Sequence, residues 1–573
     1  MIVGFLSEFS FAVTTLLIFG FAGGFLLTPF SSFGLKFLYL AAPGAGISFF
    51  AVGTGLLYGA ARLPFSVASS ITILIGISLT LSSIFKRFQR PDMSAILISG
   101  ILTGCAVFAI SASTIVEGVP SFYAGDGTDS INYSQVADYI RSHIMTAKIS
   151  LAPYDSLIAG LLPNDPRLGS FSFVAFISLL KNQSGLFSFD MASVIAFTSG
   201  VLAVAGLWAR SRGTLSIIVI GLSASSWFDY SRCGFLGKLL NYPLSLAIAG
   251  LLLCPLASVP QVACLTLLVV GIAALHSGIA TALILITVVC VQALGSVYQE
   301  RRILTNKMQC LNVCVIGAIA TSGTFARATT DEVPRWPLSW SYIFGRAWDL
   351  DNQGVFISGF TEAQASALAS FCCVLLACVA VAGFKSPFGR TFSAGVGALV
   401  LMASLYVAGA DAVMFQLIGF FYPLSLVATA ALVDDLKKTD RLRGLVTCIA
   451  IFEVAVRLPH LSGSLDRYAI GRQVARIYRQ DLISKISELA KSSSVTIDVD
   501  EPQKAAVMRA EILRDAPDVR WSCRAWNAAL LYALSRVPCT SEPERSDYIV
   551  SEKPSDEVVI HGGPLSLNKI RNR

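Results

Sequence analysis

Apolar runs as long as the hydrocarbon core of a bilayer requires recur over most of this chain, and no other feature constrains its fold as strongly. A transmembrane helix needs roughly 20 mostly apolar residues to cross a core about 30 Å thick. The 573-residue sequence is 54% hydrophobic and only 14% charged, with a mean hydropathy of +0.68. We therefore predict a polytopic membrane protein.

The apolar runs predict about fourteen membrane helices when each span is taken as roughly 17 to 25 residues. They are expected at residues 9–29, 37–59, 66–85, 94–115, 190–208, 214–228, 239–257, 260–276, 279–297, 309–325, 363–384, 391–408, 411–433 and 441–457. The predicted fold is an all-α polytopic membrane domain over residues 1–457. Residues 458–573 are expected to form a small soluble α/β domain, because charges return there, residues 495–499 alternate like a strand and residues 502–514 have a helical composition.

Basic residues between the predicted spans indicate how the chain crosses the membrane. They occur in five short loops, which all fall on one side of the span list: 86–90, 210–212, 301–302, 385–390 and 437–443. The positive-inside rule makes that side cytoplasmic, which explains the formal net charge of +7 without a nucleic-acid partner. In a bacterial-type inner membrane, residues 117–189, residues 326–362 and the C-terminal domain are then expected on the periplasmic side. Functional residues are expected there too.

The first of these outer segments is expected to hold helices that lie along the membrane surface. Residues 152–162 and 171–180 are apolar, and Pro153, Pro163 and Pro166 interrupt this segment. Broken interfacial helices explain the pattern better than further spans.

Two cysteines in the polar tail, Cys523 and Cys539, flank an apolar helical stretch at residues 528–534. Disulfides persist in oxidising compartments. A bond between these two cysteines is therefore a prediction that depends on a periplasmic tail.

The sequence Gly125-Asp-Gly-Thr-Asp129 puts two carboxylates at the end of the fourth predicted span. Its two glycines permit a tight turn, which would hold Asp126 and Asp129 close together at the membrane surface. A helix is predicted from about Ser130, with Asp129 or Ser130 as a suitable N-cap, because residues recur at helical spacing: Tyr133, Val136, Ala137 and Ile140. The same pattern also fits a purely structural interpretation, in which Asp126 belongs to the turn and Asp129 only caps the helix.

This layout resembles the GT-C superfamily of membrane glycosyltransferases, which use polyprenyl-phosphate-linked sugars. The likeness lies in the many apolar spans, an Asp-containing outer loop directly after a span, a D-x-x-x-Y continuation into a helix (Asp129 to Tyr133, then Ala137) and a soluble outer C-terminal domain. It covers the general layout and about fifteen to twenty residues in detail. The resemblance implies that an acidic residue of the loop is the catalytic base or a metal-associated carboxylate, and this role is carried to Asp126 or Asp129.

The resemblance also implies inverting transfer of a sugar to a glycan, lipid or protein acceptor. A carboxylate at the outer surface can take the proton of the acceptor hydroxyl, while cations hold the departing phosphate. The candidates for substrate binding are Tyr133, His276 and four cations on the outer side: Arg232, Lys238, Arg335 and Arg346. Each cation also fits an interfacial residue that reaches lipid head groups, and His276 also fits a hydrogen-bonded helix end. The use of a divalent metal such as Mg²⁺ or Mn²⁺ is left open.

If the acidic turn is the catalytic site, Asp→Asn at position 126 or 129 should abolish transfer without unfolding the chain. Asp138 lies about two helical turns beyond Asp129. It is expected to tolerate the same change.

Two other functions fit a polytopic chain of this kind. A transporter or flippase for lipid-linked intermediates would need ionisable residues near the middle of its spans, whereas the acids of the first outer segment gather at one face. An O-antigen polymerase or ligase is also polytopic, has a large outer loop and acts on lipid-linked glycan.

Overall fold

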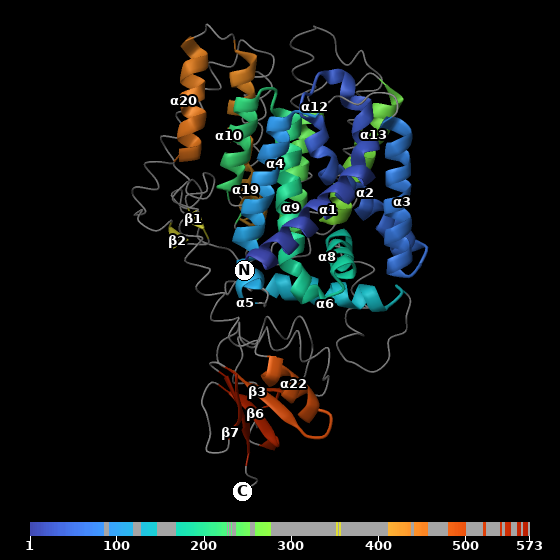
Figure 1. The fold of residues 1–573 in the computed structure, drawn as a ribbon, viewed down its shortest axis with the longest axis vertical. Coiled ribbons are helices and arrows are strands. Elements are labelled where there is room, and N and C mark those ends of the chain that lie inside the picture. The colour runs from blue at the N-terminus through green and yellow to red at the C-terminus, as the bar shows by residue number, and fades with distance from the viewer. Residues whose placement is uncertain are drawn as a thin grey trace.

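Apolar helices dominate the computed structural model, and a small mixed sheet lies near its C-terminus (Figure 1). The structure describes residues 1–84, 91–117, 128–145, 168–225, 227–228, 231, 236–252, 258–276, 351–352, 355–356, 411–436, 441–455, 480–499, 520–522, 539–540, 545–551, 558–562 and 565–570. Four predicted spans lie outside these residues, at 279–297, 309–325, 363–384 and 391–408. The predicted number of about fourteen spans therefore stays a prediction.

Five stretches of the described residues are long and apolar enough to cross a membrane: Ile2–Phe33, Leu38–Ala60, Phe65–Ser83, Met93–Ile110 and Gly185–Trp208. They contain α1 (Ile2–Leu27) with η1 (Thr28–Phe33), α2 (Ala42–Thr54) between η2 (Leu38–Ala41) and η3 (Gly55–Ala60), α3 (Phe65–Ile84), α4 (Met93–Ile110) and α9 (Gly185–Trp208). Each matches a predicted span. The fourth ends at Ile110 rather than continuing to 115, and the separate helix α5 (Ala112–Glu117) follows it.

The other helices of this part pack around those spans: α8 (Leu168–Lys181), α10 (Arg212–Ser223), α12 (Leu236–Leu252), α13 (Val259–Leu275), α19 (Asp411–Asp435) and α20 (Arg441–Ala455). α10 is shorter than the span predicted at 214–228, because the helix ends at Ser223 and a turn follows. Its 12 residues cover about 18 Å at about 1.5 Å per residue, which is less than the thickness of a bilayer core.

α9 is the central helix of this part, and nearly all of its residues are buried. It contacts α4, α8, α10 and α12. Helices in a membrane associate through close packing, so small residues mark their contacts. A Cβ at Gly200 of α9 would lie 2.7 Å from the Cβ of Pro243 in α12, and a side chain at Gly23 or Gly46 would overlap the backbone where α1 meets α2.

α6 (Thr128–Ser142) lies across one end of the helical part (Figure 1). Its predicted buried face is confirmed, because four residues at helical spacing are all buried: Tyr133, Val136, Ala137 and Ile140. The helix begins at Thr128, so Asp129 and Ser130 belong to its first turn. The prediction that one of them is the N-cap is therefore wrong.

α8 corrects the expectation of interfacial helices at residues 171–180. Ten consecutive residues of this helix, 169–178, are buried, and α8 contacts α2, α6 and α9. A helix in the interface would leave one face to lipid or water. α8 is instead an internal helix, whereas residues 152–162 lie outside the described part of the chain.

The C-terminal part contains the predicted strand at its centre. The sheet order is β5 (Cys539–Thr540), β4 (Arg520–Ser522), β3 (Val495–Asp498), β6 (Tyr548–Ser551), β8 (Leu565–Lys569) and β7 (Val558–Gly562). The first four strands are parallel to one another. β8 is antiparallel to both of its neighbours, β6 and β7. α22 (Gln480–Leu489) contacts β7 and buries Leu482 and Ile486. Parallel strands joined to helices are typical of an α/β domain.

Two smaller features complete the description. β1 (Asp351–Asn352) and β2 (Val355–Phe356) form an antiparallel pair. Cys539 lies in β5, beside Trp521 of β4, but Cys523 lies outside the described residues, so the disulfide stays a prediction.

Candidate active site

The structure describes the side chains of three predicted substrate-binding residues, and it brings two of them, Tyr133 and His276, against the first turn of α12. The third, Lys238, lies in that turn. Asp129 lies in the first turn of α6, but its side chain lies outside the description. Four other predicted site residues are not among the described ones: Asp126, Arg232, Arg335 and Arg346.

Tyr133 connects α6 to the beginning of α12. Its side chain is 2% exposed, and its ring packs against Phe171 at 5.0 Å and Phe189 at 6.2 Å between ring centroids. The Tyr133 hydroxyl accepts a hydrogen bond from the backbone N–H of Gly237 at 3.1 Å. The first N–H groups of a helix have no partner within the helix, so this phenol satisfies one of them in α12.

His276 ends α13, and neighbouring helices hold the chain around it. Its backbone is extended, with φ −162° and ψ 110°. The amide of Asn241 in α12 donates to the His276 carbonyl at 2.5 Å and to the Ile272 carbonyl at 3.2 Å. The hydroxyl of Ser170 in α8 donates to the Leu275 carbonyl at 2.5 Å. The carbonyls that a helix leaves unpaired at its C-terminus are thus satisfied by side chains of two other helices.

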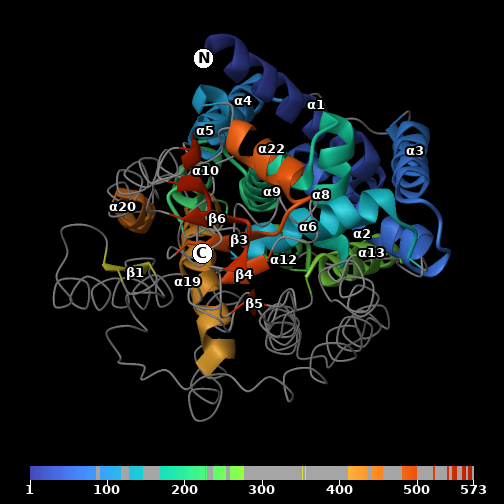
Figure 2. The same ribbon diagram turned by 90° about the horizontal axis from the view of Figure 1, so that it is seen from below.

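Gly237 is the point at which these parts meet, and we call its surroundings the Gly237 junction: Tyr133, Gly237, Lys238, Asn241 and His276. A Cβ at Gly237 would lie 2.6 Å from the Tyr133 hydroxyl oxygen and 3.1 Å from Cδ2 of His276. A hydrogen atom is therefore the only side chain that this arrangement admits. In the view from below, α6 lies next to α12 and α13 (Figure 2), and the hydrogen bond between Gly237 and Tyr133 joins α6 to the start of α12.

Lys238 adds a positive charge to the junction. It is half-buried and lies in the first turn of α12. The N-terminus of a helix carries a partial positive charge, so a lysine there does not stabilise the helix by itself. The same arrangement favours an anion, because the helix dipole and the ammonium group have the same sign.

Three residues that form these contacts were not predicted from the sequence: Gly237 and Asn241 of the junction, and Ser170, which bonds the neighbouring Leu275 carbonyl. A signal was present for two of them, because Gly237, Asn241 and Ser245 follow one another at intervals of four within an apolar stretch. This spacing puts small and polar residues on one face of a helix. Ser245 donates to the carbonyl of Asn241 at 2.8 Å, which agrees with that face.

Asp138 has a structural role in the contact between α6 and α9. The expectation that sugar transfer tolerates its replacement stays a prediction. Its Oδ1 atom accepts the backbone N–H of Gly185, the first residue of α9, at 2.8 Å. Arg141, one turn later, lies 3.6 Å from the same oxygen and donates to the Ser178 hydroxyl at 2.6 Å and to the Gln183 carbonyl. These contacts fasten α6 to the segment between α8 and α9.

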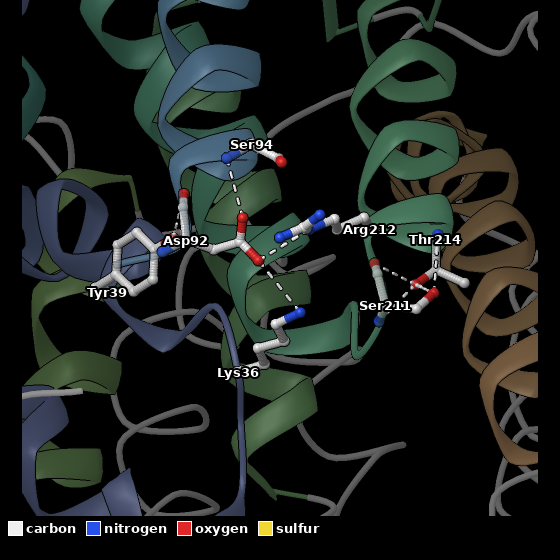
Figure 3. Close-up of polar contacts among 7 residues, drawn as sticks. All are labelled: Lys36, Tyr39, Asp92, Ser94, Ser211, Arg212 and Thr214. Atoms are coloured by element: carbon white, nitrogen blue, oxygen red, sulfur yellow. Dashed lines mark hydrogen bonds and ion pairs between the residues drawn. The ribbon is translucent and has the colours of Figure 1, made fainter. Parts of the chain in front are cut away.

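A second polar cluster lies where α4 begins (Figure 3), at the end of the helical part opposite α6 (Figure 1). Asp92 is the N-cap of α4 and accepts the backbone N–H of Ser94 at 2.9 Å through Oδ1. Its Oδ2 atom lies 3.0 Å from Nε of Arg212 and 3.2 Å from Nζ of Lys36. The Tyr39 hydroxyl accepts the backbone N–H of Asp92 at 3.0 Å. We call these residues the Asp92 cluster.

The Asp92 cluster cannot supply a base. The hydrogen bond from Arg212 is the main cause that lowers the pKa of Asp92 to about 2; burial opposes it, and Lys36 and the Ser94 N–H act with Arg212. A carboxylate with such a low pKa is a weak proton acceptor. Nearby, Asp434 of α19 accepts the backbone N–H of Arg210 at 2.9 Å and the Thr214 hydroxyl at 2.7 Å. The polar groups at this end connect helices rather than offer a reactive group.

Within the described ranges, no group of three or more His, Cys, Asp or Glu side chains could hold a metal ion. No protein-family model matches the chain, and no curated protein matches it. The function must therefore be argued from the residues themselves.

Proposed function

We propose that this chain is an inverting membrane glycosyltransferase. It transfers a sugar from a polyprenyl-phosphate donor to a glycan, lipid or protein acceptor of the cell envelope. The reaction takes place on the outer face of a bacterial inner membrane, at the end of the molecule where α6 lies. The observation that carries this proposal is the Gly237 junction, in which Tyr133 of α6 and His276 meet the turn of α12 that carries Lys238.

The sequence distance between the base and the junction supports this arrangement. Asp129 precedes Tyr133 by four positions in α6, which is about one helical turn. Asp126 is three residues further back. The cations of the Asp92 cluster pair with Asp92 next to the start of α4, at the end of the helical part opposite α6.

The reaction assigns each group one task. The carboxylate of Asp126 or Asp129 takes the proton of the acceptor hydroxyl, and the hydroxyl oxygen forms a bond to the anomeric carbon of the sugar. The bond between that carbon and the phosphate oxygen breaks, and its electron pair leaves with the polyprenyl phosphate. Lys238, with Arg232, Arg335 and Arg346, stabilises the departing phosphate. Tyr133 is a positioning residue, because its hydroxyl holds the turn that carries Lys238.

The proposal is tested with the purified full chain in lipid vesicles. A panel of polyprenyl-phosphate sugars is supplied with an envelope acceptor, and release of polyprenyl phosphate is measured. Hydrogen bonds to charged groups contribute about 1.5–3 kcal/mol, so Lys238→Gln should lower kcat/KM for the donor about 10- to 100-fold. Lys485→Gln, in the C-terminal domain, should leave it unchanged. Equal kcat/KM values for the parent chain and Lys238→Gln would mean that Lys238 is not part of the site. If no donor released polyprenyl phosphate, the proposed reaction would be contradicted.

The location of the reaction requires a periplasmic C-terminal domain. Basic loops on one side of the predicted spans support this topology. Figure 1 shows the C-terminal sheet and α6 at the same end of the helical part. A reporter that is active only in the cytoplasm should therefore be inactive when it is fused after Pro459. An active fusion would overturn both the topology and the position of the site.

One observation favours a transporter as the second candidate. Glu453 is only 3% exposed and lies inside the apolar helix α20, where it accepts the hydroxyl of Ser425 in α19 at 2.8 Å. It is about 18 Å along the helix from Arg441, and ionisable residues at such a depth commonly serve transport. In vesicles that hold a fluorescent polyprenyl phosphate, flipping that is lost in Glu453→Gln but kept in Ser425→Ala would favour this candidate over the transferase.

A further inference from the structure

An apolar groove of about 450 Å³ lies between α1 and α4, near the Asp92 cluster. We call it the α1–α4 groove, after the residues that define it: Leu17, Gly20, Gly24, Tyr39, Ile96 and Gly100. Its volume is within the range of about 300–1,000 Å³ that is common for ligand sites. The lining of such a site selects for an apolar ligand.

The space in the groove exists because two of its lining residues, Gly20 and Gly100, have no side chain. A Cβ at Gly100 would meet no atom within 4 Å, and one at Gly20 would only touch Pro43 at 3.8 Å. Glycine is therefore not required at position 100 for close packing. Its effect is to leave room in the wall of the groove.

The groove opens on a surface suited to lipid. Four apolar side chains beside it are well exposed: Leu17, Phe21, Leu97 and Ile101. Along α1 its lining extends from Val13 to Thr28, a distance of about 22 Å at about 1.5 Å per residue, which exceeds half the thickness of a bilayer core. An acyl chain of one leaflet fits a groove of this length, and the apolar lining favours such a chain over water.

The end of the groove near Tyr39 and Pro91 adjoins the two cations of the Asp92 cluster. Tyr39 lines the groove and contacts the backbone of Asp92. Lys36 and Arg212 are two cations on the one carboxylate of Asp92, and their side chains remain 47% and 63% exposed. Among the described contacts the two Nη atoms of Arg212 have no hydrogen-bond partner. A phosphate can therefore bind both cations without displacing Asp92.

We propose that the α1–α4 groove binds an anionic phospholipid of the membrane, with one acyl chain along Gly20 and Gly100 and the phosphate between Lys36 and Arg212. This inference does not rest on the proposed glycosyl transfer, whose site lies at the opposite end of the helices. The two cations at the groove mouth favour an anionic head group, and the space beside the two glycines accommodates an acyl chain. A lipid bound at this site would contact the segments that the ion pairs of Asp92 hold together.

The experiment uses the delipidated full chain in detergent and measures lipid binding by native mass spectrometry. Phosphatidylglycerol is the anionic probe and phosphatidylcholine the zwitterionic one. Each basic residue near a membrane surface contributes about 1 kcal/mol toward anionic lipid, which corresponds to about fivefold in affinity. Lys36→Gln and Arg212→Gln should each weaken phosphatidylglycerol binding about fivefold. They should weaken phosphatidylcholine binding less, because its choline group offsets the charge of its phosphate.

A second variant separates the groove from the Asp92 cluster. Gly100→Leu puts a side chain into the groove without touching the Asp92 cluster, and the loss of contact with about three methylenes should weaken binding of both lipids roughly fiftyfold. Gly444→Leu is the matched control, because a Cβ there also meets no atom within 4 Å but lies on α20. Unchanged phosphatidylglycerol binding in Gly100→Leu, or equal binding of both lipids by the parent chain, would overturn the proposal. So would tighter binding of polyprenyl phosphate at the same site.

Discussion

The two ends of the helical part use polar residues in opposite ways. At the Asp92 cluster, a carboxylate is saturated by two cations and a backbone N–H, and its pKa is lowered to about 2. At the Gly237 junction, a phenol and an amide side chain hold the backbone of two helix ends, and a lysine is set beside them. A carboxylate that is fully paired can connect helices but cannot accept a proton. The comparison therefore indicates which end can carry chemistry.

Among substitutions at residues whose side chains or contacts the structure describes, Gly237→Ala is expected to have the largest effect, because it changes the junction directly. The new Cβ would lie 2.6 Å from the Tyr133 hydroxyl oxygen, and overpacking of this kind costs about 1–3 kcal/mol. A displacement of about 1 Å at an active site can lower the rate about 10²-fold. We expect a loss of that size in sugar transfer, measured per folded molecule.

Gly444→Ala is the control for this substitution, because a Cβ there also meets no atom within 4 Å. It should not lower the thermal midpoint, since alanine favours a helix more than glycine does, and it should leave the transfer rate unchanged. If Gly237→Ala behaves in the same way, Tyr133 and His276 do not pack against position 237 and the junction is wrongly described.

A smaller effect is expected when one hydroxyl is removed at each end. Tyr133→Phe leaves the Gly237 N–H without its buried acceptor, and such a loss costs about 1–3 kcal/mol. Tyr39→Phe removes the equivalent acceptor from the Asp92 N–H, but Tyr39 is only half-buried, so water can replace it. Thermal unfolding in the same detergent should show the larger drop for Tyr133→Phe. The reverse order would mean that the Asp92 cluster is the more tightly packed end.

The smallest effect is expected on the stability of the fold at low pH. Because the folded-state pKa of Asp92 is about 2, below the ordinary value of 3.8, its ion pairs stabilise the fold fully above about pH 4. That stability is lost as the pH falls from about 4 to about 2. Lys36 and Arg212 are largely exposed, so solvent keeps the contribution small.

This acid dependence is checked by unfolding midpoints at pH 6, 4 and 3 for the parent chain and Asp92→Asn. The variant should be the less stable of the two at pH 6, and the difference should shrink toward pH 3. A constant difference over this range would show that Asp92 is not held as an ion.

Periodic features of the fold could be predicted from the sequence. The buried face of α6 follows from residues at helical spacing, the strand at Val495 follows from alternation, and the span at 190–208 follows from its apolar length. The burial of α8 could not be predicted in this way. Lipid is as apolar as a protein interior, so hydropathy does not distinguish a helix that faces lipid from one that faces other helices.

Contacts between distant positions were the other part that the sequence did not reveal. The Tyr133 hydroxyl meets an N–H that is 104 positions away, and Asp138 accepts one that is 47 positions away. Hence Tyr133 could be proposed as a site residue from its motif, and this stays a prediction, whereas the contacts of Gly237 and Asn241 required the packing of α6, α12 and α13. The structural contact of Asp138 could not be predicted for the same reason.

The central claim is that the carboxylates at the α6 end perform chemistry and that Asp92 only connects helices. It is tested most directly by comparing sugar transfer per folded molecule in four variants: Asp126→Asn, Asp129→Asn, Asp138→Asn and Asp92→Asn. A general base contributes about 10²- to 10⁴-fold, so one of the first two should lose that much and keep the parent's thermal midpoint. Asp138→Asn and Asp92→Asn should unfold at lower temperature and transfer sugar within about threefold of the parent, well inside that loss. Retention of transfer in both Asp126→Asn and Asp129→Asn, or its loss in Asp92→Asn at equal folded amount, would contradict the account.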